Sequence, residues 1–105
     1  MKRIMLICSA GMSTSLLVTK MEAAAKDQGI EADIFAVSAS EANSRFEDTS
    51  KPIDVVLLGP QVRFMKKQFE DKLSGTGIPV EVIEMKDYGM MNGEGVLKTA
   101  LELIG

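Results

Sequence analysis

The fold of this 105-residue chain is decided by the stretch Ile4-Met5-Leu6-Ile7, followed by Cys8-Ser9-Ala10-Gly11-Met12-Ser13-Thr14-Ser15-Leu16-Leu17. An apolar run leads into a loop of small residues, and helical spacing begins directly after it. Small residues let backbone N–H groups turn inward, and the start of a helix adds unpaired donors and the positive end of its dipole. The stretch therefore predicts a strand, an anion-binding loop and a helix, with Cys8 at the floor of the loop.

Cys8 is the only cysteine in the chain. The donors that would hold a phosphate would also stabilise the thiolate, which is the nucleophilic form of a cysteine. A cysteine at a strand end is also often a small buried hydrophobe, and a turn of Ser and Gly is often only a helix start. On the residues alone, the functional and the purely structural interpretations stay open.

The rest of the chain alternates between strand and helix patterns. A helix is expected to begin at Ser13 or Thr14 as its cap and to stop near Gly29. Pro60 suits the first turn of a later helix. Strands are expected over residues 2–7, 30–37, 53–58 and 79–85, helices over 38–48, 62–73 and 94–104, and a loop over 86–93.

This alternation predicts an α/β fold, in which right-handed crossovers join parallel strands and helices cover both faces of the sheet. Ligands of such folds lie beyond the carboxyl ends of the strands. Three loops would meet there: the Cys8 loop, Gly59-Pro60-Gln61, and residues 86–93. The length predicts a single domain with its own core.

Composition excludes several classes of function. The net charge is −3 with both signs interspersed, which argues against nucleic acid as a partner. The chain has no histidine, which excludes phosphohistidine carriers, Cys-His and Ser-His-Asp catalysis, and imidazole metal sites. We therefore expect no metal and no cofactor. The apolar run behind Met1-Lys2-Arg3 is too short for a signal peptide or a membrane span, so a cytoplasmic location without membrane insertion is expected.

The run Leu6 to Leu17 closely resembles the active-site loop of IIB components of the sugar phosphotransferase system (PTS), lactose/cellobiose (diacetylchitobiose) family. The resemblance continues through the later pieces Asp54-Val55-Val56-Leu57-Leu58-Gly59-Pro60-Gln61, Pro79-Val80-Glu81-Val82-Ile83, Tyr88-Gly89 and Gly95-Val96-Leu97, so that it covers essentially the whole chain. It implies a single IIB domain over residues 1–105. The implied fold is a flavodoxin-like, four-stranded parallel sheet of order 2-1-3-4, similar to that of low-molecular-weight tyrosine phosphatases.

The same resemblance implies a phosphoryl carrier, and thus a phosphotransferase. Cys8 would accept a phosphoryl group from the phosphohistidine of a IIA protein. It would pass the group to a sugar held by the membrane IIC component, a β-linked disaccharide such as cellobiose, chitobiose or lactose. By the match of motifs, the phosphoryl oxygens would be bound by Ser9, Ala10, Gly11, Met12, Ser13, Thr14 and Ser15. The expected partner-docking surface around the loop comprises Met12, Gly59, Pro60, Gln61 and Tyr88.

An alternative is a cysteine phosphatase or an arsenate-reductase relative, because the loop also resembles the Cys-x5-Arg loop of low-molecular-weight phosphatases. A phosphatase needs a guanidinium clamp at the sixth residue after the cysteine, and that residue is Thr14 here. Thr14 therefore favours a carrier, whose phosphocysteine must survive until its acceptor arrives. Arg63 is interpreted as a surface charge. Asp87 is the best-placed general acid, although it is also a common type of loop residue. A plain α/β binding module with an inert cysteine is the third alternative.

Overall fold

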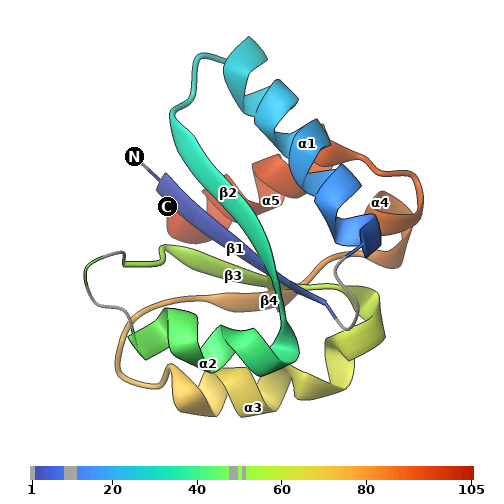
Figure 1. Cartoon of the computed structure of the whole chain (residues 1–105). Helices are drawn as coiled ribbons and strands as arrows, with labels where there is room; N and C mark the ends of the chain where they lie inside the picture. Colours follow the sequence, from blue (N-terminus) through green and yellow to red (C-terminus); the bar gives the residue numbers. More distant parts are fainter. Residues whose placement is uncertain (1, 9–11, 48–49, 51) are drawn as a thin grey trace.

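The computed structural model describes residues 2–8, 12–47, 50 and 52–105 (Figure 1). Its strands form one parallel sheet in the order β2-β1-β3-β4. This confirms the α/β class and the strand order that the resemblance implied. In chain order the elements are β1 (Lys2–Cys8), α1 (Met12–Asp27), β2 (Ala32–Ser38), α2 (Ala39–Glu47), β3 (Val55–Leu58), η1 (Pro60–Met65, a 3₁₀ helix), α3 (Lys66–Lys72), β4 (Val80–Val82), α4 (Met85–Gly89) and α5 (Gly93–Ile104).

Helices cover both faces of the sheet, as predicted, with α1 and α5 on one side and α2 and α3 on the other (Figure 1). The side chains of β1 alternate between the two faces. Ile4 and Leu6 pack with α1 and α5, while Met5 and Ile7 pack with α2, η1 and α3. A strand covered on both faces must be apolar where it is covered, which explains why β3 and residues 4–8 of β1 are continuous apolar runs.

The two ends of α1 differ in how well they agree with the predictions made from the sequence. Gly29 has a left-handed backbone with φ of 69°, and its N–H donates to the carbonyl of Lys26 at 3.1 Å, which confirms the predicted stop. At the other end α1 begins at Met12. Ser13 and Thr14 therefore lie inside the first turn, and the prediction that one of them precedes the helix as its cap was wrong.

Three further predictions required correction. The expected strand over 79–85 is shorter, since β4 ends at Val82, and the helix α4 begins at Met85 and occupies the first part of the expected loop over 86–93. This five-residue helix is too short to give a helical repeat in the sequence. The expected single helix over 62–73 is two elements, η1 and α3, with a non-helical backbone at Val62 (φ −116°, ψ 21°). Pro60 does occupy the first turn of η1, as predicted.

The approach of α5 to α1 depends on one glycine. Gly93 is buried, and a Cβ atom at this position would lie 2.6 Å from the backbone nitrogen of Met21. Asn92 caps the helix, because its side-chain oxygen accepts a hydrogen bond of 3.1 Å from the N–H of Gly95. The glycine therefore lets the start of α5 approach the backbone of α1 at Lys20 and Met21.

Candidate functional site at the carboxyl edge of the sheet

Cys8 is the last residue of β1, so it lies at the edge of the sheet where the parallel strands end at their carboxyl termini, hereafter the carboxyl edge. The residue is 2% exposed. Its Sγ lies 3.9 Å from the carbonyl oxygen of Val37 on β2, to which the thiol donates. Cys8 is therefore a buried residue at this edge of the sheet.

The turn after β3 lies directly beside Cys8. The N–H of Gly59 donates a hydrogen bond of 2.8 Å to the carbonyl of Ile7. A Cβ atom built on Gly59 would lie 3.7 Å from the Cβ atom of Cys8. The turn after β3 therefore lies beside the end of β1, while the expected loop after Cys8 falls outside the described residues.

The first turn of α1 carries the last of the expected phosphate-binding residues. Ser9, Ala10 and Gly11 lie outside the described residues, and for Met12 and Ser13 the structure describes the helical backbone only. Ser15 is exposed, whereas Thr14 is completely buried. The hydroxyl oxygen of Thr14 lies 3.4 Å from the hydroxyl oxygen of Tyr88, within hydrogen-bonding reach. Thr14 is thus turned toward α4 inside the protein.

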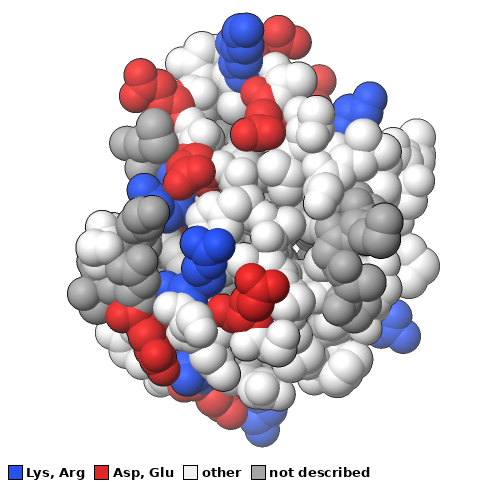
Figure 2. Space-filling view, viewed as in Figure 1, with Lys and Arg blue, Asp and Glu red and all other residues white. Residues whose placement is uncertain are grey.

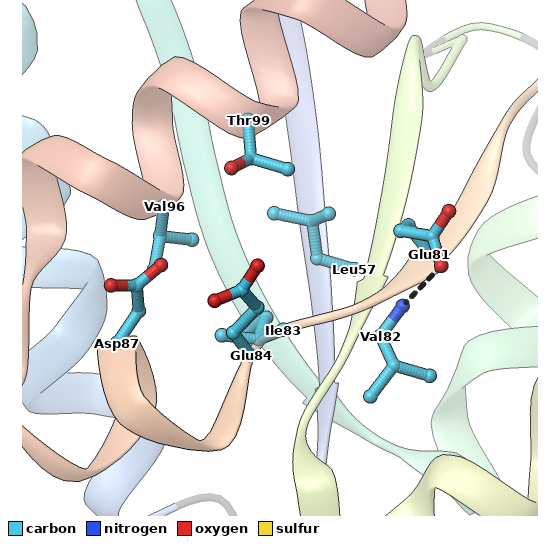
Figure 3. Close-up of a pocket in the computed structure, with 8 residues that line it drawn as sticks. All are labelled: Leu57, Glu81, Val82, Ile83, Glu84, Asp87, Val96 and Thr99. Carbon is cyan, nitrogen blue, oxygen red and sulfur yellow. Dashed lines mark hydrogen bonds between the residues drawn. The ribbon is translucent and has the colours of Figure 1, made fainter.

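Arg63 and Asp87 bear on the phosphatase alternative. Arg63 is exposed, which agrees with its interpretation as a surface charge, and its Nη1 donates to the carbonyl of Pro60 at 3.5 Å. Asp87 lines a cavity of about 210 Å³ between β4 and α5, together with Glu84 and Thr99 (Figure 3). Its Oδ1 accepts a hydrogen bond of 3.2 Å from the side chain of Asn92. Cys8 is not among the residues that line this cavity.

Acidic side chains around that cavity do not make a metal site. Glu81 forms an ion pair with Lys66 at 3.2 Å, and its carboxylate also accepts the N–H of Val82 at 3.3 Å. Within the described ranges, no group of three or more His, Cys, Asp or Glu side chains is arranged to hold a metal ion.

Comparison with known proteins identifies the family. A family model described as "PTS system, Lactose/Cellobiose specific IIB subunit" matches residues 3–99. The chain belongs to this family. Subunits of this IIB type are phosphotransferases, and they work together with IIA and IIC partners.

Curated relatives match this IIB chain along nearly its whole length. The cellobiose-specific EIIB component of Lactococcus lactis subsp. lactis is 50% identical over 104 residues, which cover 98% of this chain and 96% of the relative. A galactose-specific EIIB component of Lactococcus lactis subsp. cremoris is 49% identical over 98% of this chain and 96% of the relative. The oligo-beta-mannoside-specific EIIB component of Bacillus subtilis is 47% identical over 99% of this chain and 97% of the relative.

Solved structures agree with the assignment. The solution structure of the cellobiose-specific phosphotransferase IIB component from Borrelia burgdorferi is 44% identical, with a TM-score of 0.77 over 98% of this chain and 91% of that one. The lactose-specific IIB domain from Streptococcus pneumoniae gives a TM-score of 0.79 over 96% and 95% of the two chains at 16% identity, which shows the shared fold alone. Across the described part of this IIB chain, no helix is long and apolar enough to cross a membrane.

The residues expected to dock partners differ in their exposure. Gly59 and Pro60 are buried, and Gln61 is exposed. Tyr88 is only 8% exposed, because its ring packs in the core between the sheet, α1 and α5. This burial argues against the expected contact between Tyr88 and a partner. The side chain of Met12 lies outside what the structure describes.

Sequence analysis missed the apolar side chains that are exposed near this edge. Leu16 follows β1 and is 51% exposed, Phe64 follows β3 and is 78% exposed, and Met85 follows β4 and is 65% exposed. We call these three residues the edge patch. In Figure 1, the beginning of α1 lies on the same side of the molecule as η1 and α4. That side carries few charged side chains in Figure 2, which has the same view. Phe64 falls within the single helix expected over 62–73, but in the structure it belongs to η1, whose backbone is not helical at Val62.

Proposed function

We propose that this chain is a phosphoryl carrier in which Cys8 forms the phosphocysteine. The observation that carries the proposal is the position of Cys8 at the end of a central strand, directly before the loop and the first turn of the sixteen-residue helix α1. The first N–H groups of a helix have no partner within it, and together with the loop they offer donors to phosphoryl oxygens. The proposed oxygen-binding residues are 9–15.

The transfer proceeds in two displacement steps. The sulfur of Cys8 attacks the phosphorus of a phosphohistidine on a IIA protein, the S–P bond forms and the N–P bond breaks. The departing imidazole nitrogen takes a proton, which balances the proton that the thiol loses. A sugar hydroxyl held by a membrane IIC component then attacks the same phosphorus, its proton passes to solvent or a base, and the thiolate leaves. Backbone donors neutralise the phosphoryl oxygens in both steps without a metal.

Thr14 supports a carrier over a phosphatase. A guanidinium at this position would stabilise the transition state of hydrolysis. The Thr14 side chain is instead fully buried against Tyr88, so it cannot stabilise that transition state. A phosphocysteine in this site would therefore be hydrolysed more slowly than one in a phosphatase.

The edge patch and Gln61 are the proposed docking surface. All four side chains are exposed, and each follows the carboxyl end of β1, β3 or β4 in the chain. Because both the IIA donor and the IIC acceptor must reach the same sulfur, they use this surface one after the other. The whole chain, residues 1–105, acts as one domain at the cytoplasmic side of the membrane.

The proposed sugar is a β-linked disaccharide. Support comes from the family description and from relatives that are named for cellobiose and oligo-beta-mannosides. The test is formation of sugar phosphate from phosphoenolpyruvate, with the general PTS proteins, a IIA protein and membranes that contain IIC. We expect phosphorylation of cellobiose in the presence of the wild-type chain and none with Cys8→Ser. Phosphorylation at an equal rate with Cys8→Ser contradicts the proposal.

A further inference from the structure

Two hydroxyl groups from distant parts of the chain meet inside the protein. Among the residues that the structure describes, Thr14 is the only polar one in the buried class apart from Tyr88, and it is 0% exposed. Its Oγ1 atom lies 3.4 Å from the hydroxyl oxygen of Tyr88, 74 residues later in the chain. This contact joins the first turn of α1 to α4.

Tyr88 is held firmly on its own side of this contact. Its N–H donates to the carbonyl of Glu84 at 2.9 Å, and the N–H of Asn92 donates to the carbonyl of Asp87 at 2.9 Å. The Asn92 side chain adds a second bond to Asp87 at 3.2 Å. The Tyr88 ring packs in the core cluster with Val96 and the rest of the α1–α5 layer. These contacts hold the Tyr88 side chain in place, and the first turn of α1 contacts its hydroxyl through Thr14.

We propose that Tyr88 is a positioning residue for phosphoryl transfer at Cys8. It acts through Thr14: the contact fixes the first turn of α1, and so the N–H donors of that turn, relative to the sulfur. The inference rests on the proposed function, because it assigns Tyr88 a role in the same transfer. A misplacement of about 1 Å in a reacting site can lower a rate about 100-fold, so a single remote contact is enough to matter.

A positioning role can be separated from a merely structural one by removing the hydroxyls singly and together. Tyr88→Phe or Thr14→Val leaves one hydroxyl buried without this contact, whereas the double variant removes both. Replacing two side chains that contact each other changes stability non-additively. We therefore expect the thermal midpoint to fall in each single variant, and the double variant to lose less than the sum of the two single losses.

The transfer rate is expected to follow a different pattern. In single-turnover phosphorylation by a phosphorylated IIA protein, Tyr88→Phe and the double variant should both react at least about tenfold more slowly at saturating IIA. The IIA concentration for half-maximal rate should be unchanged, because Tyr88 is buried away from the docking surface. Thr99→Val is the matched control, since its hydroxyl bonds the carbonyl of Gly95 at 3.1 Å within α5. It should react at the wild-type rate.

Each outcome bears on the inference. A double variant that is folded at the assay temperature and still slow supports positioning by Tyr88. Rates that equal wild type in Tyr88→Phe, or a rate that returns to wild type in the double variant, overturn it while wild-type phosphorylation on Cys8 stands. A wild-type chain that takes no phosphoryl group on Cys8 overturns the proposed function, and this inference with it.

Discussion

The backbone N–H of Gly59 donates a 2.8 Å hydrogen bond to the carbonyl of Ile7, which joins the end of β3 to the end of β1 beside Cys8. Gly59 has an ordinary extended backbone, with φ of −63° and ψ of 151°, so its conformation does not require glycine. What distinguishes the position is space: an added Cβ atom would lie 3.7 Å from that of Cys8 and 2.8 Å from the side-chain oxygen of Gln61.

Gly59→Ala is therefore expected to fold normally and to transfer phosphoryl groups more slowly. The side chain of Gln61 can move away, so the free energy of unfolding should stay within about 0.5 kcal/mol of wild type. The new methyl group crowds the approach to the Cys8 sulfur. Urea denaturation and single-turnover phosphorylation measure the two effects. A transfer rate equal to that of wild type would show that this approach is not used.

Phe64→Ser should weaken docking of the IIA protein without changing stability. An exposed aromatic side chain that becomes buried in an interface commonly contributes more than 1 kcal/mol to binding. We expect the IIA concentration for half-maximal phosphorylation to rise about tenfold, which corresponds to about 1.4 kcal/mol. The measurement is the rate of Cys8 phosphorylation as a function of IIA concentration.

Met90→Ser is the control for the docking surface. Met90 is 71% exposed, but it lies in a hollow with the later residues of α1, such as Lys20 and Asp27, away from the start of that helix. It should leave the IIA dependence unchanged. Equal effects of Phe64→Ser and Met90→Ser would mean that the edge patch has no special part in docking.

Gly93→Ala is expected to destabilise the protein. Its methyl group would lie 2.6 Å from the backbone nitrogen of Met21, and backbone atoms cannot move aside as a side chain can. Overpacking of this kind costs about 1–3 kcal/mol of unfolding free energy. Gly89→Ala is the matched control, because its Cβ would have no neighbour within 4 Å. Denaturation midpoints that shift equally in both variants would contradict the tight approach of α5 to α1.

Asp54→Ala should cost more stability than Asp33→Ala. The Asp54 carboxylate accepts the backbone N–H of Arg3 at 2.8 Å in a partly buried place, and loss of such an acceptor costs about 1–3 kcal/mol. Asp33 forms an ion pair of 3.2 Å with the Arg3 side chain, but it is 41% exposed, so that pair contributes about 0–1 kcal/mol. Urea midpoints of the two variants test the order, and a larger loss in Asp33→Ala would reverse it.

Much of the fold could be predicted from the sequence because the strong patterns are local. The apolar runs of β1 and β3 and the stop at Gly29 follow from residues that are neighbours in the chain. The strand order came from the family resemblance, since alternation alone does not fix it. The helix α4 was missed because five residues are too few to show a helical repeat.

The candidate site was predictable only in part. The place of Cys8 at a strand end could be inferred from the run before it. The burial of Tyr88 and its contact with Thr14 could not, because they depend on a partner 74 residues away. The exposure of Phe64 could not be predicted either, because the helical pattern over 62–73 does not reveal the non-helical backbone at Val62.

The central claim is that Cys8 carries the phosphoryl group, and mass spectrometry tests it most directly. The chain is incubated with phosphoenolpyruvate, the general PTS proteins and a IIA protein, and its intact mass and fragments are compared with those of Cys8→Ser. We predict one added phosphoryl group, located on Cys8, absent from Cys8→Ser, and lost when membranes with IIC and sugar are added. An unmodified chain in the presence of demonstrably phosphorylated IIA, or a phosphoryl group on another residue, would contradict the account.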